Sequence, residues 1–464
     1  MSLIGAIMVP HPPLIVPDVG RGQEKGISST VDAFKKAADF IVSLEPETVI
    51  VISPHSAMYS DYFHISPGSS ASGNFGQFRA RNVGIKAEYD KAFAEALGSR
   101  AGLAGLPAGS LGERDRNLDH GTMIPLYFIR EALAGRKLPK IVRIGLSGLP
   151  LTEHYRLGML IKETAELPDR SVAVIASGDL SHKLTHDGPY GFSPEGPLYD
   201  ERIMDVMGRG AFGELFGFPE SFCEKAAECG HRSFVVMAGC FDGVSVHAQR
   251  LSHEGPFGVG YGVCTFLPGA ADESRRFLDI RREALRREAA ARIASEDPYV
   301  ALARASFTAW TENRERIPVP EGLPPEMYKR RAGVFVSLHL DGALRGCIGT
   351  ISPAADCIAE EIIENAIAAC SRDNRFTPVR QEELNQIECS VDVLGEAEPV
   401  SSIDELDAAR YGVIVTSGRR RGLLLPALDG VDTPQQQISI AKRKAGIPEG
   451  ETVALQRFEV VRHH

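Results

Sequence analysis

The sequence predicts an α/β domain with a mixed central sheet flanked by helices over residues 1–268, a charged helical linker over 269–297, and an α+β domain over 298–464. A chain of 464 residues is too long for a single hydrophobic core. Its first part alternates continuous apolar runs with helical patterns, as in sheets that are buried on both faces. Its last part mixes helices with strands that look antiparallel, which is typical of α+β folds.

Short apolar runs, rich in β-branched residues, are the candidate strands of the first domain: Leu3–Val9, Thr48–Ser53, Lys140–Leu146, Ser171–Ala176 and Val259–Phe266. Helical patterns lie between them. The stretch STVDAFKKAADFIVSL has a continuous apolar stripe and begins with hydroxyl side chains that can cap a helix. This alternation of strand and helix predicts the α/β order.

The composition changes after Pro268. The stretch GAADESRRFLDIRREALRREAAARIASED has helical periodicity and few large apolar residues. It predicts a solvated connecting helix rather than a basic recognition helix, because acidic residues interleave with the arginines. The second domain then has candidate helices at PYVALARASFTAWTEN and PAADCIAEEIIENAIAACSRD, and candidate strands at GVFVSLHL, ECSVDVL, YGVIVTS and GLLLPAL.

Charge and cysteine usage restrict the partners and the compartment. The formal net charge of -10 argues against nucleic acid and anionic membranes as partners. No run reaches the about 18 apolar residues of a transmembrane helix, and the N-terminus lacks the features of a signal peptide. Eight cysteines without a CxxC pair are typical of reduced thiols, so we expect a cytoplasmic protein. The sequence leaves open whether the chain forms a homo-oligomer.

Four of the 13 histidines stand where ligands bind in α/β folds. His11, His55 and His182 follow three predicted strands, and His120 precedes an apolar helix. The carboxyl ends of parallel strands meet at one edge of a sheet, where ligands collect in a crevice. Proline cannot donate to a strand ladder, so the prolines just before His11 and His55 would end their strands and turn each imidazole into that crevice.

Two imidazoles at one crevice favour a metal site. Imidazole binds Zn, Fe, Cu and Ni, and two histidines with one carboxylate are the arrangement of non-haem Fe(II) oxygenases. The residues alone leave a second interpretation open, in which His11 and His55 form hydrogen bonds in a crevice that binds something else.

The motifs VPHPP, SPHS, DHGTMIPL and SGDLSH, in this order along the first domain, resemble those of the class III extradiol ring-cleavage dioxygenases and their Memo-like relatives. The resemblance implies that His11 and His55 bind a metal ion. It also implies that His182 is the catalytic acid–base histidine, and that His120 lies in the pocket, where it either contacts the substrate or supports a ligand.

Two adjacent residues of KAAECGHRSF are candidates for the third metal ligand. The dioxygenases use a carboxylate near the start of a late helix, and the Memo-like members use a cysteine. Glu228 would complete a two-histidine, one-carboxylate site for Fe(II), whereas Cys229 would give a softer site for Zn or Cu(I). We expect Glu228, because dioxygenase chemistry needs hard, weakly binding ligands.

The resemblance implies a leading function for this domain, that of a non-haem Fe(II)-dependent extradiol-type dioxygenase. Its substrate would be a small molecule such as a catechol. His182 would accept a substrate hydroxyl proton, for which an imidazole with a pKa near ~6.5 is suited. The alternative is a Memo-like metal-binding protein with Zn or Cu, without dioxygenase activity, that acts with a radical-SAM partner in a modification pathway.

In the second domain, LRGCIGT places a cysteine between two glycines after an apolar strand, which predicts a tight turn with close backbone approach. Cys347 would be either a reactive thiolate, with its pKa lowered by a cation such as Arg345, or a small buried apolar residue.

Together with RDNRFTPVRQEEL, VDVL, GLLLP and KAGIP, this motif resembles the AMMECR family over nearly the whole second domain. In prokaryotes such domains belong to the AmmeMemoRadiSam system, and the chain resembles its system protein A fused to a dioxygenase-like partner. The resemblance implies a radical-SAM protein as partner. It also points to a site of unknown activity among Arg345, Cys347, Asp373 and Arg375, although Asp373 and Arg375 would equally form a structural ion pair.

Overall fold

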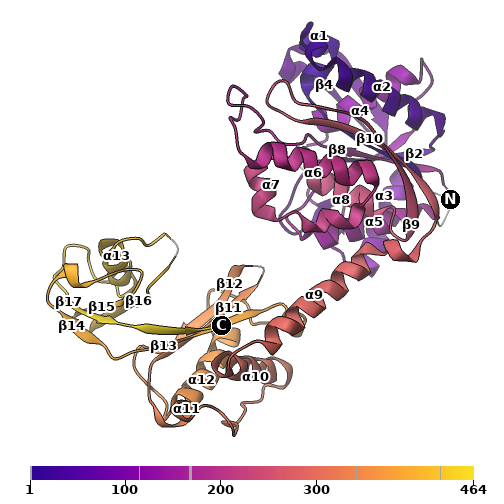
Figure 1. The fold of residues 1–464 in the computed structure, drawn as a ribbon. Coiled ribbons are helices and arrows are strands. Elements are labelled where there is room, and N and C mark those ends of the chain that lie inside the picture. Colours follow the sequence, from indigo (N-terminus) through magenta and orange to yellow (C-terminus); the bar gives the residue numbers. More distant parts are fainter. Residues whose placement is uncertain (1–2, 114, 167–169, 341, 429) are drawn as a thin grey trace. The chain divides into compact units, whose positions relative to one another are not determined.

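The structure is a computed structural model, and it describes residues 3–113, 115–166, 170–340, 342–428 and 430–464. The chain forms two compact units, Met1–Glu283 and Ala284–His464 (Figure 1). The boundary between them falls within helix α9 (Phe277–Ala294), in the segment for which the sequence predicts a connecting helix. The predicted fold classes, α/β for the first part and α+β for the second, are confirmed.

A six-stranded mixed sheet forms the centre of the first unit, in the order β7-β2-β8-β1-β10-β9. The neighbours from β7 to β1 are parallel, whereas β10 pairs antiparallel with both β1 and β9. The strands are β1 (Leu3–Val9), β2 (Thr48–Ser53), β7 (Lys140–Gly145), β8 (Val172–Ser177), β9 (Val244–Glu254) and β10 (Tyr261–Ala271).

Two differences from the sequence prediction concern the last two strands. Strand β9 was not predicted, because its segment VSVHAQRLSHE is largely polar and most of its residues are only partly buried. Strand β10 extends to Ala271, beyond the predicted end at Phe266, because β9 pairs with it along its whole length.

Side chains of the parallel strands alternate between two cores, one on each face of the sheet. Ile50 and Ile52 face one core, and Val49 and Val51 face the other, so that every residue of β2 is buried. The first core is covered by α3 (Lys91–Leu103), α5 (Leu151–Glu166), α6 (Glu195–Arg209) and α8 (His231–Gly239). The second core is covered by α2 (Ser28–Ser43) and α4 (His120–Ala132).

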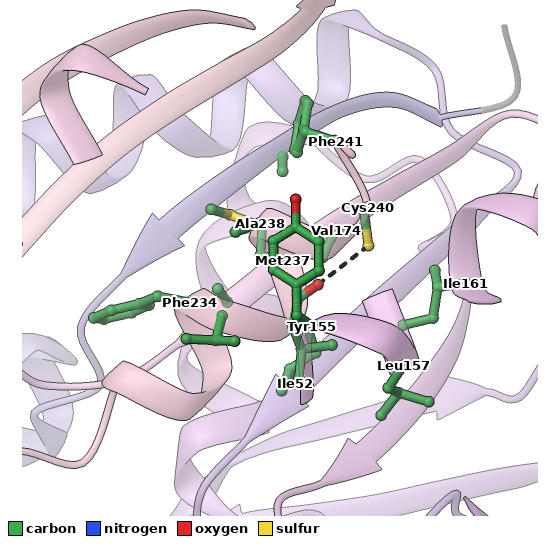
Figure 2. Close-up of a cluster of buried hydrophobic side chains, with 14 of the residues drawn as sticks. Ile52, Tyr155, Leu157, Ile161, Val174, Phe234, Met237, Ala238, Cys240 and Phe241 are labelled. Carbon is green, nitrogen blue, oxygen red and sulfur yellow. Dashed lines mark hydrogen bonds between the residues drawn. The ribbon is translucent and has the colours of Figure 1, made fainter. Parts of the chain in front are cut away.

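Helices α5 and α8 touch through their backbones. A Cβ atom added to Gly158 would lie 1.9 Å from the Val236 carbonyl oxygen, and one added to Gly239 would lie 2.0 Å from that of Tyr155. Figure 2 shows Tyr155 among the buried side chains of this core, and its hydroxyl donates a hydrogen bond to Asp242 (2.7 Å). Glycine is therefore needed at both positions for the two helices to pack this closely.

The second unit has two antiparallel four-stranded sheets, in the orders β12-β11-β13-β18 and β14-β17-β15-β16. The helices α10 (Pro298–Asn313) and α12 (Ile358–Ser371) pack on the first sheet, and α13 (Pro434–Lys444) packs on the second. The strands are β11 (Val334–Leu340), β12 (Ala343–Gly349), β13 (Glu388–Leu394), β14 (Glu398–Val400), β15 (Gly412–Ser417), β16 (Arg420–Leu424), β17 (Ala454–Phe458) and β18 (Val460–His463).

The predicted tight turn at LRGCIGT is wrong, because these residues form strand β12. The close backbone approach that the glycines suggested does occur. A Cβ atom on Gly346 would lie 2.3 Å from the Ala369 carbonyl oxygen of α12, so glycine is needed there for packing against the helix. All eight cysteines are free of disulfides, and none of the described helices is long and apolar enough to cross a membrane.

Candidate metal centre

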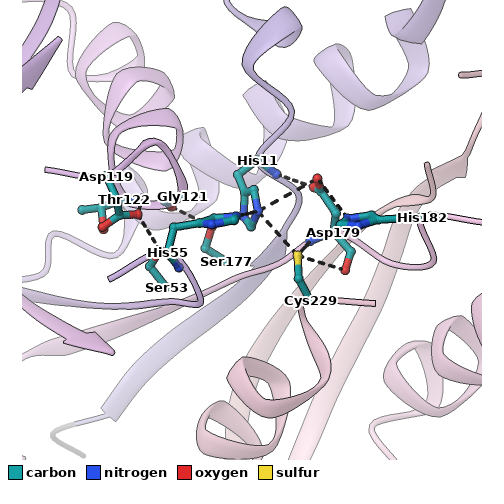
Figure 3. A network of polar contacts seen from close by, with 10 residues as sticks. All are labelled: His11, Ser53, His55, Asp119, Gly121, Thr122, Ser177, Asp179, His182 and Cys229. Atoms are coloured by element: carbon teal, nitrogen blue, oxygen red, sulfur yellow. Dashed lines mark hydrogen bonds and ion pairs between the residues drawn. The ribbon is translucent and has the colours of Figure 1, made fainter. Parts of the chain in front are cut away.

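Six polar side chains gather at the carboxyl ends of β1, β2 and β8, which are neighbours in the sheet. His11, His55, Asp179 and His182 follow these strands, His120 is the first residue of α4, and Cys229 comes just before α8. Figure 3 shows His11 at the centre, with His55 on one side and Asp179 and Cys229 on the other. The structure therefore brings together the four histidines that the sequence singled out.

His11 is fixed in one tautomer by its neighbours. The ring is buried, and its Nδ1 lies 2.9 Å from the Ser177 hydroxyl oxygen. That hydroxyl donates its single proton to the Gly121 carbonyl (2.6 Å), so Nδ1 of His11 must carry a proton and donate it to Ser177. The lone pair of His11 therefore lies on Nε2, which is the arrangement of a metal-binding histidine with a supporting partner.

His55 lies directly opposite His11, with 2.9 Å between the two Nε2 atoms. Nitrogen ligands about 2.0–2.1 Å from one metal ion lie about 2.9–3.4 Å apart when the angle at the metal is between a right angle and a tetrahedral angle. The His120 ring centre lies 4.0 Å from that of His55. Asp119 caps α4 by accepting from the Thr122 amide (2.9 Å), and it also accepts from the Ser53 hydroxyl (2.6 Å).

Cys229, and not Glu228, faces His11. The Cys229 sulfur lies 3.6 Å from Nε2 of His11, which is the separation expected for a nitrogen at about 2.0–2.1 Å and a sulfur at about 2.3 Å on a tetrahedral ion. The Glu228 carboxylate instead accepts a hydrogen bond from the His231 amide (2.6 Å) at the start of α8. The geometry therefore gives no support to the expectation that Glu228 is the third ligand, because the helix start engages that carboxylate.

Asp179 is a member of the site that the sequence analysis did not identify. Its carboxylate accepts a hydrogen bond from the His11 amide (2.7 Å), and its second oxygen lies 4.0 Å from Nε2 of His11 and 3.9 Å from Nε2 of His182. Asp179 belongs to the motif SGDLSH, so it follows the same predicted strand as His182, and its position after that strand is the signal that predicts it.

Burial shifts the pKa values at the site in the direction that favours neutral groups. It lowers the pKa of His11 and His55, and it lowers that of His120 to about 3. Burial also raises the pKa of Asp179 to about 6 and raises that of Cys229. Neutral imidazoles offer their lone pairs, and a bound cation would offset the penalty of a buried carboxylate and thiolate. The donor set thus fits a transition-metal ion.

His182 stands beside this donor set. Its Nε2 faces Asp179, its ring stacks on that of Tyr190 with 5.1 Å between ring centres, and its side chain is 21% exposed. The two groups of donor atoms close enough to share an ion, among the residues that the structure describes, are His11–His55–His120 and His11–Asp179–Cys229. His182 belongs to neither group, so it is free to exchange a proton with a bound molecule.

The four residues named in the second domain also lie together. Arg345 pairs with Glu383 (2.8 Å) and donates to the Thr377 carbonyl (2.7 Å). Asp373 accepts from the Cys347 amide (2.9 Å) and pairs with Arg375 (2.7 Å), which holds the pKa of the Asp373 carboxyl below its usual range. Asp373 and Arg375 thus hold the Cys347 backbone, since Arg375 also donates to its carbonyl (3.1 Å), and the partly buried Cys347 sulfur accepts a hydrogen bond from the Ser337 hydroxyl (3.2 Å).

Alkylation of the folded protein is expected to modify Cys347 while the buried cysteines stay unmodified, because only partly exposed thiols meet the reagent. Iodoacetamide treatment followed by peptide mass spectrometry measures this. The buried Cys240, Cys264, Cys370 and Cys389 serve as internal controls. Modification of Cys347 only after denaturation would show that its thiol is a packing group.

Comparisons with known proteins identify the families of the two domains. The family described as "Catalytic LigB subunit of aromatic ring-opening dioxygenase" matches residues 5–264, and the AMMECR1 family matches residues 300–463. A protein of Clostridium acetobutylicum is 41% identical over 472 residues, which cover 100% of this chain and 99% of that protein. A protein of Thermotoga maritima is 51% identical over 170 residues, which cover 36% of this chain and 98% of that protein.

Two solved structures of uncharacterized proteins were also found. One, from Pyrococcus horikoshii, is 29% identical, covers 35% of this chain and 88% of its own, and has a TM-score of 0.34. The other, from Escherichia coli K12, is 14% identical, covers 56% of this chain and 99% of its own, and has a TM-score of 0.38. The family matches and the full-length relative confirm the predicted fusion: the chain belongs to the family of the catalytic LigB subunit of aromatic ring-opening dioxygenase, with an AMMECR1 domain as its second part.

Proposed function

We propose that the first domain is a metal-dependent enzyme of the ring-opening dioxygenase type, which uses Fe(II) and acts on a small aromatic diol. The observation that carries this proposal is the facing pair of His11 and His55, with 2.9 Å between their Nε2 atoms at the carboxyl edge of the sheet. A bound Fe(II) would supply the redox chemistry that a reaction with dioxygen requires.

Residues of the chain bind the metal ion and move the substrate proton. His11 and His55 hold the ion, and the third ligand comes from the donors next to them. His182 accepts the proton of a substrate hydroxyl, because its side chain is partly exposed and burial lowers its pKa, which keeps it neutral at pH 7. Asp179 stabilises the imidazolium that results, at 3.9 Å from that nitrogen.

A second candidate is favoured by the position of Cys229. A thiolate 3.6 Å from the lone-pair nitrogen of His11 makes a softer site, suited to Zn or Cu(I). The first domain would then be a Memo-like metal protein without dioxygenase activity, which acts in the cytoplasm with a radical-SAM partner in a modification pathway. The fusion to an AMMECR1 domain supports this candidate.

The metal content of the purified protein tests both candidates. Elemental analysis of the full chain, purified without oxygen, is expected to give iron near one ion per chain. That iron should be absent from the variant His11→Ala/His55→Ala. Oxygen uptake with a panel of catechols then tests for ring opening. Zinc or copper in place of iron, without oxygen uptake, would support the second candidate, and no metal in either protein would contradict both.

A further inference from the structure

The side chain of Cys347 lies on the face of the β11–β12 sheet that α12 does not cover. Its two neighbours in β12 face the helix: a Cβ atom on Gly346 would touch α12, and Ile348 packs against the core that α12 covers. Since successive side chains of a strand point to opposite faces, Cys347 points away from that core. There it lies opposite Ser337 of β11, whose hydroxyl donates to the sulfur (3.2 Å).

The second sheet of this unit packs against the same face. Phe335, which is on the same face of β11 as Ser337, shares an apolar cluster with Leu423 of β16. The preceding residue of β16, Gly422, meets α13, because a Cβ atom there would lie 2.2 Å from the Ala441 carbonyl oxygen. This packing brings α13 toward the sheet that carries the thiol.

Two cationic side chains act on the region of the thiol. Lys444, the last residue of α13, reaches solvent, but its ammonium group is partly desolvated. This burial lowers the pKa of Lys444, a thiolate at Cys347 acts against it, and the charge of Arg375 lowers the pKa further. Arg375 also donates to the Cys347 carbonyl (3.1 Å). The thiol, the ammonium group and the guanidinium group thus form one cluster.

Positive charge is in excess in this cluster. Asp373 pairs with Arg375 (2.7 Å), but among the residues that the structure describes no carboxylate pairs with Lys444. An ammonium group that is partly buried beside another cation is unfavourable, and a nearby negative charge offsets this cost. Two anions can supply that charge, a thiolate at Cys347 and an oxyanion of a bound ligand.

We propose that Cys347, Lys444 and Arg375 form a second site of the chain, which binds a small ligand through a carboxylate or phosphate group next to a reactive thiol. Lys444 attracts the oxyanion as a point charge. Arg375 adds a donor, since its Nη1 has no partner among the described residues. Asp373 holds both the Cys347 amide (2.9 Å) and Arg375 in place.

The net charge of the whole chain favours a small ligand over a nucleic acid. At -10, the chain repels an extended polyanion, whereas a single oxyanion interacts mainly with the charges next to it. No residue of the first unit takes part in this site, so its tests do not depend on the metal centre.

Alkylation with a charged and a neutral reagent of similar size tests the proposal. Iodoacetate carries a carboxylate, and iodoacetamide is its neutral analogue. With both, the sulfur displaces iodide from carbon and the thiol proton passes to the solvent. Peptide mass spectrometry of the full chain measures both rates at Cys347, before and after denaturation. We expect the iodoacetate-to-iodoacetamide rate ratio to be about two- to fivefold higher in the folded chain, as an exposed pair of opposite charges allows. Added salt should reduce this difference.

Substitutions of Lys444 separate charge from structure. Lys444→Gln should lower the ratio to that of the denatured chain, and Lys444→Arg should keep it, because arginine retains the charge. Lys329→Gln is the matched control and should change nothing, since Lys329 is an exposed lysine at the end of α11 (Pro325–Lys329). Inorganic phosphate or acetate, added at constant ionic strength, should slow iodoacetate more than iodoacetamide, and the stronger competitor identifies the preferred oxyanion.

Four results would overturn the proposal. The folded and denatured chains would show the same ratio, or the raised ratio would persist in Lys444→Gln. Neither phosphate nor acetate would compete, or Cys347 would react only after denaturation.

Discussion

Replacement of His182 by glutamine is expected to abolish substrate turnover and leave the metal content of the protein unchanged. His182 lies in neither group of donor atoms, yet its Nε2 is within 3.9 Å of Asp179 at the edge of the same crevice. General acid–base catalysis contributes about 10²–10⁴-fold, so a loss of this size is expected in oxygen uptake. Elemental analysis of the same samples checks the metal. Loss of metal together with activity would instead identify His182 as a ligand.

The pH dependence of the rate gives this prediction a second test. Burial lowers the pKa of His182 below its usual value near ~6.5, so the imidazole is neutral at pH 7 and becomes protonated only on acidification. Because a base must be unprotonated, the rate should fall as the pH drops through that lowered pKa. His186→Gln is the matched control, since His186 lies in the same loop and packs against Phe192. This variant should keep both the rate and its pH profile.

The parts of the fold that could be predicted from the sequence are those encoded locally. A continuous apolar run that ends in Pro-His specifies both a buried strand and the point at which it stops, so β1 and β2 were placed correctly. Strand β9 has no such local pattern, because it lies at the edge of the sheet and is formed by pairing with β10. In LRGCIGT, Gly346 is needed because helix α12 packs directly against the strand. This contact joins residues that are not neighbours in the sequence, so the local pattern does not reveal it.

The residues of the candidate site also differ in how well the sequence predicts them. His11, His55 and His182 could be found because each follows a strand, and His120 because it begins an apolar helix. The order of the strands brings them together. Glu228 and Cys229 could not be told apart, because adjacent residues point in different directions and the choice depends on contacts with the segment that follows β8. The amide and carbonyl of Asp179 both bond to Cys229, whereas Glu228 is engaged by the first turn of α8.

Replacement of Gly178 by alanine is expected to cause a large loss of metal affinity, because this glycine lets β8 and the start of α8 meet. A Cβ atom on Gly178 would lie 2.1 Å from Cα of Gly230, a distance that real Cβ contacts do not reach. These two glycines stand next to Asp179 and Cys229, so any shift that relieves the clash moves the carboxylate and the sulfur apart. Strand β8 is held between β1 and β2, so the shift falls on the segment at Cys229.

Titration of Gly178→Ala with Cu(I), beside chemical unfolding of the first domain, measures both consequences. We expect affinity to fall by at least about 10–100-fold, and the free energy of unfolding to fall by about 1–3 kcal/mol, as for other overpacked sites. Gly102→Ala is the matched control, because a Cβ atom there meets nothing within 4 Å in helix α3. Alanine at that position should leave affinity unchanged and raise stability by up to about 1 kcal/mol. If Gly178→Ala bound Cu(I) as tightly as the unmodified chain, the contact between β8 and α8 would not be what holds Cys229 beside His11, and the sulfur would have to reach the ion by another arrangement of this loop.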